Sequence, residues 1–89
     1  MYKIMIVEDD ASLAKALQKT ISSWDYDVRC VKRFDAVTDE CREIEPHLVI
    51  MDIMLPFYNG YHWCAEIRKF SKVPVMFLSS AADNMHIVM

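Results

Sequence analysis

The residues best placed to do chemistry in this sequence are acidic residues that end two apolar runs. Asp52 follows the run Leu-Val-Ile-Met at 48–51, and Glu8 and Asp9 follow the run Ile-Met-Ile-Val at 4–7. If these runs form neighbouring parallel strands, their acidic ends meet at one edge of a sheet. Three carboxylates at that edge can share a divalent cation, and one of them can act as a nucleophile. The pattern therefore indicates phosphoryl chemistry on Asp52.

Composition restricts the class of protein further. The chain has 89 residues, enough for one domain, and its hydrophobic fraction of 54% is ample for a core. The formal net charge of −3 provides no basic surface for nucleic acid, so we expect no direct nucleic-acid contact. The sequence has no apolar stretch of membrane-spanning length and no signal peptide. The cysteines (Cys30, Cys41 and Cys64) are odd in number and lack a CxxC pair, which favours a reduced, cytoplasmic protein.

Short apolar runs predict the strands that would position the acidic residues. We expect strands at 3–7, 27–31, 48–51 and 73–78. The first, third and fourth runs are almost continuously apolar, as in strands covered on both faces of a parallel sheet. The second alternates between apolar and polar residues, which suits a more exposed edge strand.

Helical periodicity separates these runs. The expected apolar stripes are Leu13, Leu17, Ile21 and Trp24 in a first helix, Val37, Cys41 and Ile44 in a second, and Trp63, Cys64, Ile67 and Phe70 in a third. The first helix should begin near Asp10 or Ala11, Asp35 should cap the second, and Asn59-Gly60 should form a turn before the third. We expect Trp24 and Trp63 to be packed, and a fourth helix to start near Ala82 or Asp83.

Alternating strands and helices predict an α/β protein with a parallel sheet and helices on both faces. In such open sheets, the functional crevice lies at the carboxyl ends of the strands. Glu8, Asp9, Asp52 and Ser79 all fall at such ends. We interpret Asp10, in contrast, as a helix cap or first-turn residue, because negative charge is favourable there.

Three segments occur in the order typical of one family: 6–10 (IVEDD), 49–56 (VIMDIMLP) and 73–81 (VPVMFLSSA). Together they resemble receiver domains of two-component response regulators, most closely those of the winged-helix transcription-factor subgroup. The resemblance covers the whole chain and implies a flavodoxin-like, doubly wound parallel sheet of order 2-1-3-4. Receiver domains continue into a fifth strand, which bears a lysine, and a fifth helix. Residues 1–89 are therefore expected to form a single receiver domain that is incomplete at its C-terminus.

The resemblance also implies a role for each candidate residue. Asp52 would accept a phosphoryl group from a sensor histidine kinase, and Ser79 would contact that group. Glu8, Asp9, Asp52 and the backbone carbonyl of Met54 would hold Mg²⁺. The protein would not be an enzyme in the usual sense, since it would assist only its own phosphorylation and dephosphorylation. Phosphorylation would switch an effector domain absent from this chain, one expected to bind DNA and regulate transcription.

Two further expectations follow. Without a fifth strand, residues 75–78 would form a bare apolar edge, and without a fifth helix part of the stripe Leu13, Leu17 and Ile21 would be uncovered. Such surfaces favour self-association or exchange of segments between chains. The alternative function is a receiver-like interaction or dimerisation module that is not phosphorylated.

Overall fold

A computed structural model describes residues 1–78 and 85–88 of the chain. The sheet has the order β2-β1-β3-β4-β5. Its strands are β1 (Lys3–Val7), β2 (Asp27–Cys30), β3 (Leu48–Asp52), β4 (Val75–Leu78) and β5 (Met85–Val88), and its helices are α1 (Ala11–Ser22), α2 (Val37–Ile44) and α3 (Gly60–Arg68). Strands β1 to β4 are parallel to one another, and β5 is antiparallel to β4. The predicted α/β class and the 2-1-3-4 order of the parallel strands are thus confirmed.

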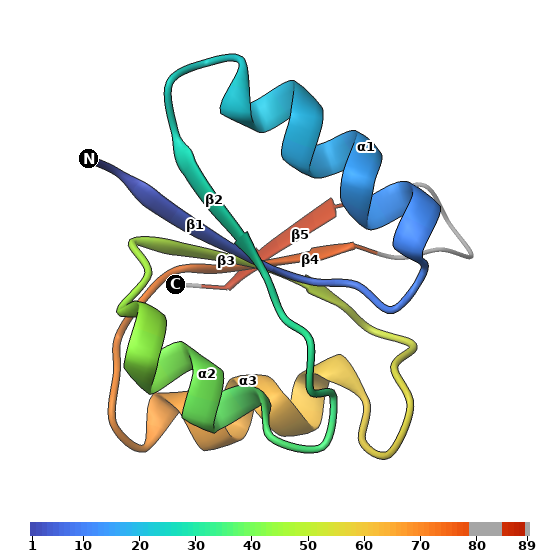
Figure 1. Cartoon of the computed structure of the whole chain (residues 1–89). Coiled ribbons are helices and arrows are strands. Elements are labelled where there is room, and N and C mark those ends of the chain that lie inside the picture. The colour runs from blue at the N-terminus through green and yellow to red at the C-terminus, as the bar shows by residue number, and fades with distance from the viewer. Residues whose placement is uncertain (79–84, 89) are drawn as a thin grey trace.

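The helices lie on both faces of the sheet: α1 covers one face, and α2 and α3 cover the other (Figure 1). This arrangement explains the continuous apolar runs, because alternate residues of a strand point to opposite faces. In β1, Met5 and Val7 belong to the cluster that contains the α2 and α3 side chains, whereas Ile4 and Ile6 pack with Leu17 and Ile21 of α1. Both faces of the central strands are therefore buried.

The predicted stripes of α2 and α3 are largely confirmed. Val37, Cys41, Trp63, Cys64 and Ile67 are all buried in the larger cluster. The predicted Asp35 cap is wrong. Helix α2 begins at Val37 after Ala36, which makes no side-chain cap hydrogen bond. Glu40 instead turns its carboxylate back towards the preceding loop, where it accepts hydrogen bonds from the backbone N–H groups of Lys32 and Arg33 at 3.0 and 2.7 Å.

Trp24 is not packed, contrary to the expectation from helical spacing. Helix α1 ends at Ser22, so Trp24 lies in the following turn, and 63% of its surface is exposed. The next residue, Asp25, has a φ of 67°, which turns the chain away from the direction of the helix. The stripe is therefore interrupted by the helix end before it reaches Trp24.

The expectation of a bare β4 edge is also wrong. Residues 85–88, where the fourth helix was expected to run, form β5, and this strand pairs with the whole of β4 in the register Val75↔Val88 to Leu78↔Met85. The expected start of that helix, Ala82 or Asp83, lies outside the described residues. Pairing with β5 supplies backbone partners along β4, so this edge no longer supports the prediction of self-association. That prediction is otherwise untested.

The face that carries α1 is less completely covered than the other. A groove of about 630 Å³ runs along it, lined mainly by apolar side chains that include Leu17, Ile21, Ile50 and Met76. Leu13 of the same helix is exposed. The expected exposure of part of the α1 stripe is therefore observed. Among residues 1–78 and 85–88, no helix is long and apolar enough to cross a membrane.

Candidate functional site

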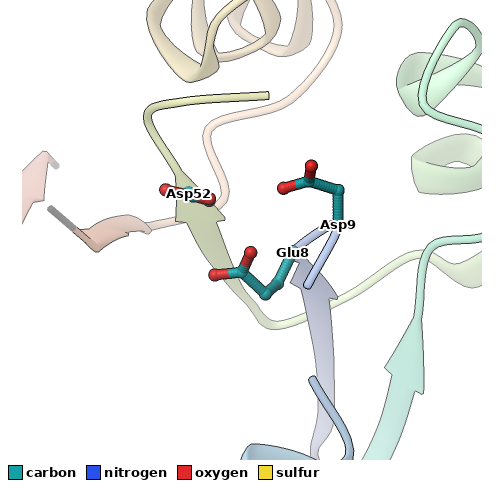
Figure 2. Close-up of side chains that lie close together, drawn as sticks. All are labelled: Glu8, Asp9 and Asp52. Carbon is teal, nitrogen blue, oxygen red and sulfur yellow. The ribbon is translucent and has the colours of Figure 1, made fainter. Parts of the chain in front are cut away.

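The acidic residues predicted from the two apolar runs do meet at one edge of the sheet. Strands β1 and β3 are adjacent and in register, with Ile6 beside Ile50 and Val7 beside Met51. The residues that follow, Glu8 and Asp9 on one strand and Asp52 on the other, therefore lie close together (Figure 2). Each of the three offers a carboxylate oxygen, and these oxygens all lie within 4.8 Å of one another. This is the grouping that the sequence predicted.

The three carboxylates differ in their surroundings. Glu8 and Asp52 are buried, with 7% and 4% of their surface exposed, whereas Asp9 is exposed. Burial raises the pKa of Glu8 from 4.5 to about 7, and the hydrogen bond and negative charge of Asp52, together with the charge of Asp9, add to this rise. A backbone hydrogen bond from Asp10 opposes it. Near pH 7, Glu8 is therefore present in both its protonated and its ionised form.

Two backbone groups hold these carboxylates in place. The N–H of Asp10 donates to Glu8 Oε2 at 3.1 Å, and the N–H of Met54 donates to Asp52 Oδ1 at 3.3 Å. Asp10 itself caps α1, since its Oδ1 accepts from the N–H groups of Ser12 and Leu13. The prediction that Asp10 is a cap is confirmed. Asp10 therefore serves helix α1, whereas Glu8 and Asp9 belong to the acidic cluster with Asp52.

Gly60 fixes the path of the loop that follows β3. It is the first residue of α3, and its N–H donates to the carbonyl of Ile53 at 2.8 Å. A Cβ on this residue would collide with the backbone carbonyl oxygen of Asp52 and approach Met51 Cγ to 2.9 Å. The start of α3 therefore packs against the backbone of Asp52, at the end of β3, at a distance that only glycine permits.

The donor set fits a hard divalent cation. Carboxylate oxygens are preferred ligands of Mg²⁺, and three of them at this spacing repel one another unless a positive charge lies between them. Burial is the main cause of the raised pKa of Glu8, and the negative charges of Asp52 and Asp9 add to it. The geometry thus supports Glu8, Asp9 and Asp52 as members of a metal site. Ser79 lies outside the described residues.

The sequence patterns do not single out three aromatic residues in the segment that follows Asp52, namely Phe57, Tyr58 and Tyr61. All three are exposed. They belong to a segment, residues 53–65, that contains no Asp, Glu, Lys or Arg, although charged residues make up 26% of the chain. That absence of charge is the signal by which the segment could be found.

The chain is similar to known proteins in sequence and in structure. Residues 4–89 match the response regulator receiver domain family. The chain is 45% identical over 89 residues to the sensory transduction protein BceR of Halalkalibacterium halodurans, covering all of this chain and 38% of BceR. It therefore spans less than half the length of that relative.

Solved structures agree with the sequence match. The N-terminal domain of the nisin resistance regulator NsrR, a lantibiotic response regulator, has a TM-score of 0.85 and 42% identity, covering 97% of this chain and 73% of that one. The BeF₃-activated N-terminal receiver domain of RstA from Klebsiella pneumoniae has a TM-score of 0.82 and 32% identity, covering 88% and 67%. The chain belongs to the response regulator receiver domain family.

Proposed function

We propose that this receiver domain accepts a phosphoryl group on Asp52 from a phosphohistidine of a sensor histidine kinase. The observation that carries the proposal is the convergence of Glu8, Asp9 and Asp52, whose carboxylate oxygens lie within 4.8 Å of one another. The BeF₃-activated form of the RstA receiver, a relative with 32% identity, supports the same chemistry in the family.

In this proposal, a carboxylate oxygen of Asp52 attacks the phosphorus of the phosphohistidine. A new O–P bond forms as the N–P bond breaks, and the bonding electron pair leaves with the imidazole nitrogen. Asp52 is oriented for this step by the N–H of Met54, which holds its Oδ1.

Glu8, Asp9, Asp52 and the backbone carbonyl of Met54 would hold Mg²⁺. When bound, Mg²⁺ would neutralise the negative charge that accumulates on the transferring phosphoryl oxygens. Glu8 must then be ionised, so it releases its proton as the ion binds. We further propose that Ser79 contacts the phosphoryl group and that a cytoplasmic, full-length protein carries an effector domain, with DNA binding and transcription as its output.

Phosphorylation of the full-length gene product by acetyl phosphate and Mg²⁺ tests the proposal. Intact mass should show one phosphate adduct on the wild type and none on Asp52→Asn. Asp10→Asn is the matched control, because it removes a neighbouring charge yet retains a capping side chain, and it should still form the adduct. Absence of an adduct on a folded wild-type protein would instead support the alternative, an interaction or dimerisation module that is not phosphorylated.

The metal site is tested separately by titration with Mg²⁺. Binding to the wild type should be saturable, and Asp9→Asn should weaken it at least about tenfold, because a charged ligand is lost while the buried pair remains. Unchanged affinity in Asp9→Asn would remove Asp9 from the proposed ligand set.

A further inference from the structure

The segment between β3 and α3 exposes an unusual concentration of large apolar side chains. Met54, Phe57, Tyr58 and Tyr61 have exposed fractions of 68%, 74%, 51% and 55%. They occur within eight consecutive residues, whereas Tyr2, Trp24 and Tyr26, which are also exposed, come from separate parts of the chain and line the groove on the α1 face. We call these four residues the aromatic patch. Exposed apolar patches of this kind mark interaction sites more often than isolated apolar residues do.

Fold stability does not account for Phe57. Its φ is 69°, in the left-handed region that bulky side chains avoid, and the N–H of Tyr58 donates to the carbonyl of Pro56 across it at 2.8 Å. This is a tight γ-turn with a strained central residue. Glycine or asparagine would adopt the turn with less strain, and an exposed phenylalanine gains no burial in return. Neither the turn geometry nor burial among the described residues therefore accounts for a phenylalanine at this position.

The rest of the aromatic patch is held in place by the core. Tyr58 stacks on His62, with ring centroids 4.1 Å apart and planes at 17°, and meets Trp63 edge-on at 5.5 Å. The ring of Tyr61 packs against that of Phe77 in β4, with ring centroids 4.9 Å apart. Trp63 and Phe77 are buried, so the exposed rings rest on fixed supports. A surface that is ordered before binding loses little conformational entropy when a partner arrives.

The position of the aromatic patch limits what can cover it. Met54 is two residues from Asp52 and holds the Asp52 carboxylate through its N–H, so the patch begins at the phosphoacceptor itself. A protein that brings a phosphohistidine to Asp52 must lie against this loop. Since residues 53–65 carry no charge, the complementary surface is apolar, whereas the acids at 8–10 flank Asp52 on the side of β1.

We propose that the aromatic patch is a docking surface for the histidine kinase and that it binds apolar side chains next to the phosphohistidine. The inference rests on the proposed function, and it adds the site and the chemistry of partner recognition. Phe57 is its central contact, because aromatic side chains supply much of the binding energy at interfaces.

Comparing phosphorylation by two donors, a histidine kinase and a small molecule, distinguishes an effect on docking from an effect on phosphoryl transfer itself. The purified kinase is the sensor histidine kinase of the source organism that transfers phosphate to the wild-type, full-length protein fastest, and the small donor is acetyl phosphate. Phe57→Asn should lower kcat/KM for transfer from the kinase by about tenfold. The rate with acetyl phosphate should change less than twofold, since that donor has no surface to dock. Asn tolerates positive φ, so the variant should fold, which its urea unfolding midpoint verifies.

Trp24→Ser is the matched control, because it removes an equally exposed aromatic side chain from the turn after α1 and should leave both rates unchanged. Equal kinase-dependent rates in Phe57→Asn and the wild type would overturn the docking proposal while leaving phosphorylation of Asp52 intact. So would a wild-type dimer in sedimentation that Phe57→Asn dissociates without slowing transfer, because the aromatic patch would then bind a second copy. Lack of an Asp52 adduct with either donor would overturn the proposed function as well.

Discussion

The loop that follows β1 and the loop that follows β3 leave the same edge of the sheet but contain opposite kinds of residue. The first consists of three acids, Glu8, Asp9 and Asp10, and leads at once into α1. The second, residues 53–59, is uncharged and exposes aromatic side chains before α3 begins. Each ends in a side chain that caps its helix, Asp10 for α1 and Asn59 for α3.

This difference shows how one edge of a sheet can serve two purposes. Carboxylates on the first loop would provide the ligands for a cation in the proposed function, and their mutual repulsion has to be tolerated by the fold. The second loop has no charged residue. Gly60, which follows it, lets α3 pack closely against β3, and Phe57 lies at an exposed turn within it. Asp52, at the end of β3, lies between the two loops, so that a partner recognised by one would meet the charge gathered by the other.

The largest effect that distinguishes the loops should be a dependence of stability on pH that arises from Glu8. Its pKa is about 7 in the folded protein and 4.5 in the unfolded chain, so between these values the folded state binds more protons. The free energy of unfolding should therefore be greatest at the acidic end of this window and fall as pH rises through 7. The loss is on the order of 3 kcal/mol, since one pKa unit corresponds to about 1.4 kcal/mol.

Urea unfolding at pH 5 and pH 8 in the presence of a chelator measures this loss. Glu8→Gln should flatten the profile, because the amide does not titrate. Mg²⁺ should restore stability to the wild type at pH 8, where it can pair with ionised Glu8. The same fall in stability in Glu8→Gln as in the wild type would assign the titration to another group.

A smaller effect is expected at the base of the second loop. Gly60→Ala should destabilise the protein by about 2 kcal/mol, because the added Cβ meets the backbone of Asp52 and the side chain of Met51. Helix propensity predicts the opposite sign, since alanine is favoured over glycine by about 1 kcal/mol within a helix. A lower urea midpoint in Gly60→Ala would show that the steric contact dominates, and a higher midpoint would show that helix propensity dominates.

Ala65→Gly provides the propensity control, because Ala65 is exposed in the same helix. It should cost about 1 kcal/mol. If Gly60→Ala were neutral or stabilising, α3 would not be held against β3 by the close contact described here.

The smallest effect should come from the two helix caps. Asp10→Ala and Asn59→Ala each remove an acceptor of backbone N–H groups, so each should lower the free energy of unfolding by about 1 kcal/mol. Only the Asp10 contribution should decrease at high salt, because it includes the interaction of a charge with the helix dipole. Urea unfolding of both variants at 0.05 M and at about 1 M salt checks this. If salt changed the destabilisation by Asp10→Ala and by Asn59→Ala equally, the charge of Asp10 would contribute nothing to its capping of α1.

Much of the fold follows from local pattern. Nearly continuous apolar runs predict β1, β3 and β4, because strands buried on both faces need such residues, and alternation predicts β2 as a more exposed edge strand. The cap at Asp10 follows from side-chain chemistry that acts within three residues. Asn59-Gly60, predicted as a turn before the third helix, is instead the cap and first residue of α3. Trp24, Asp35 and residues 85–88 depart from the prediction for a shared reason. Each depends on where an element ends or what it pairs with, and neighbouring residues determine neither.

The candidate site divides in the same way. The sequence by itself determined that Glu8, Asp9 and Asp52 share one edge, since parallel pairing of two apolar runs leaves no other place for their ends. Only the tertiary structure decided that Glu8 is buried against Asp52, which raises its pKa, and that Phe57 occupies a left-handed turn on the surface. Desolvation and backbone strain depend on what packs around a residue, and that packing exists only once distant parts of the chain have come together.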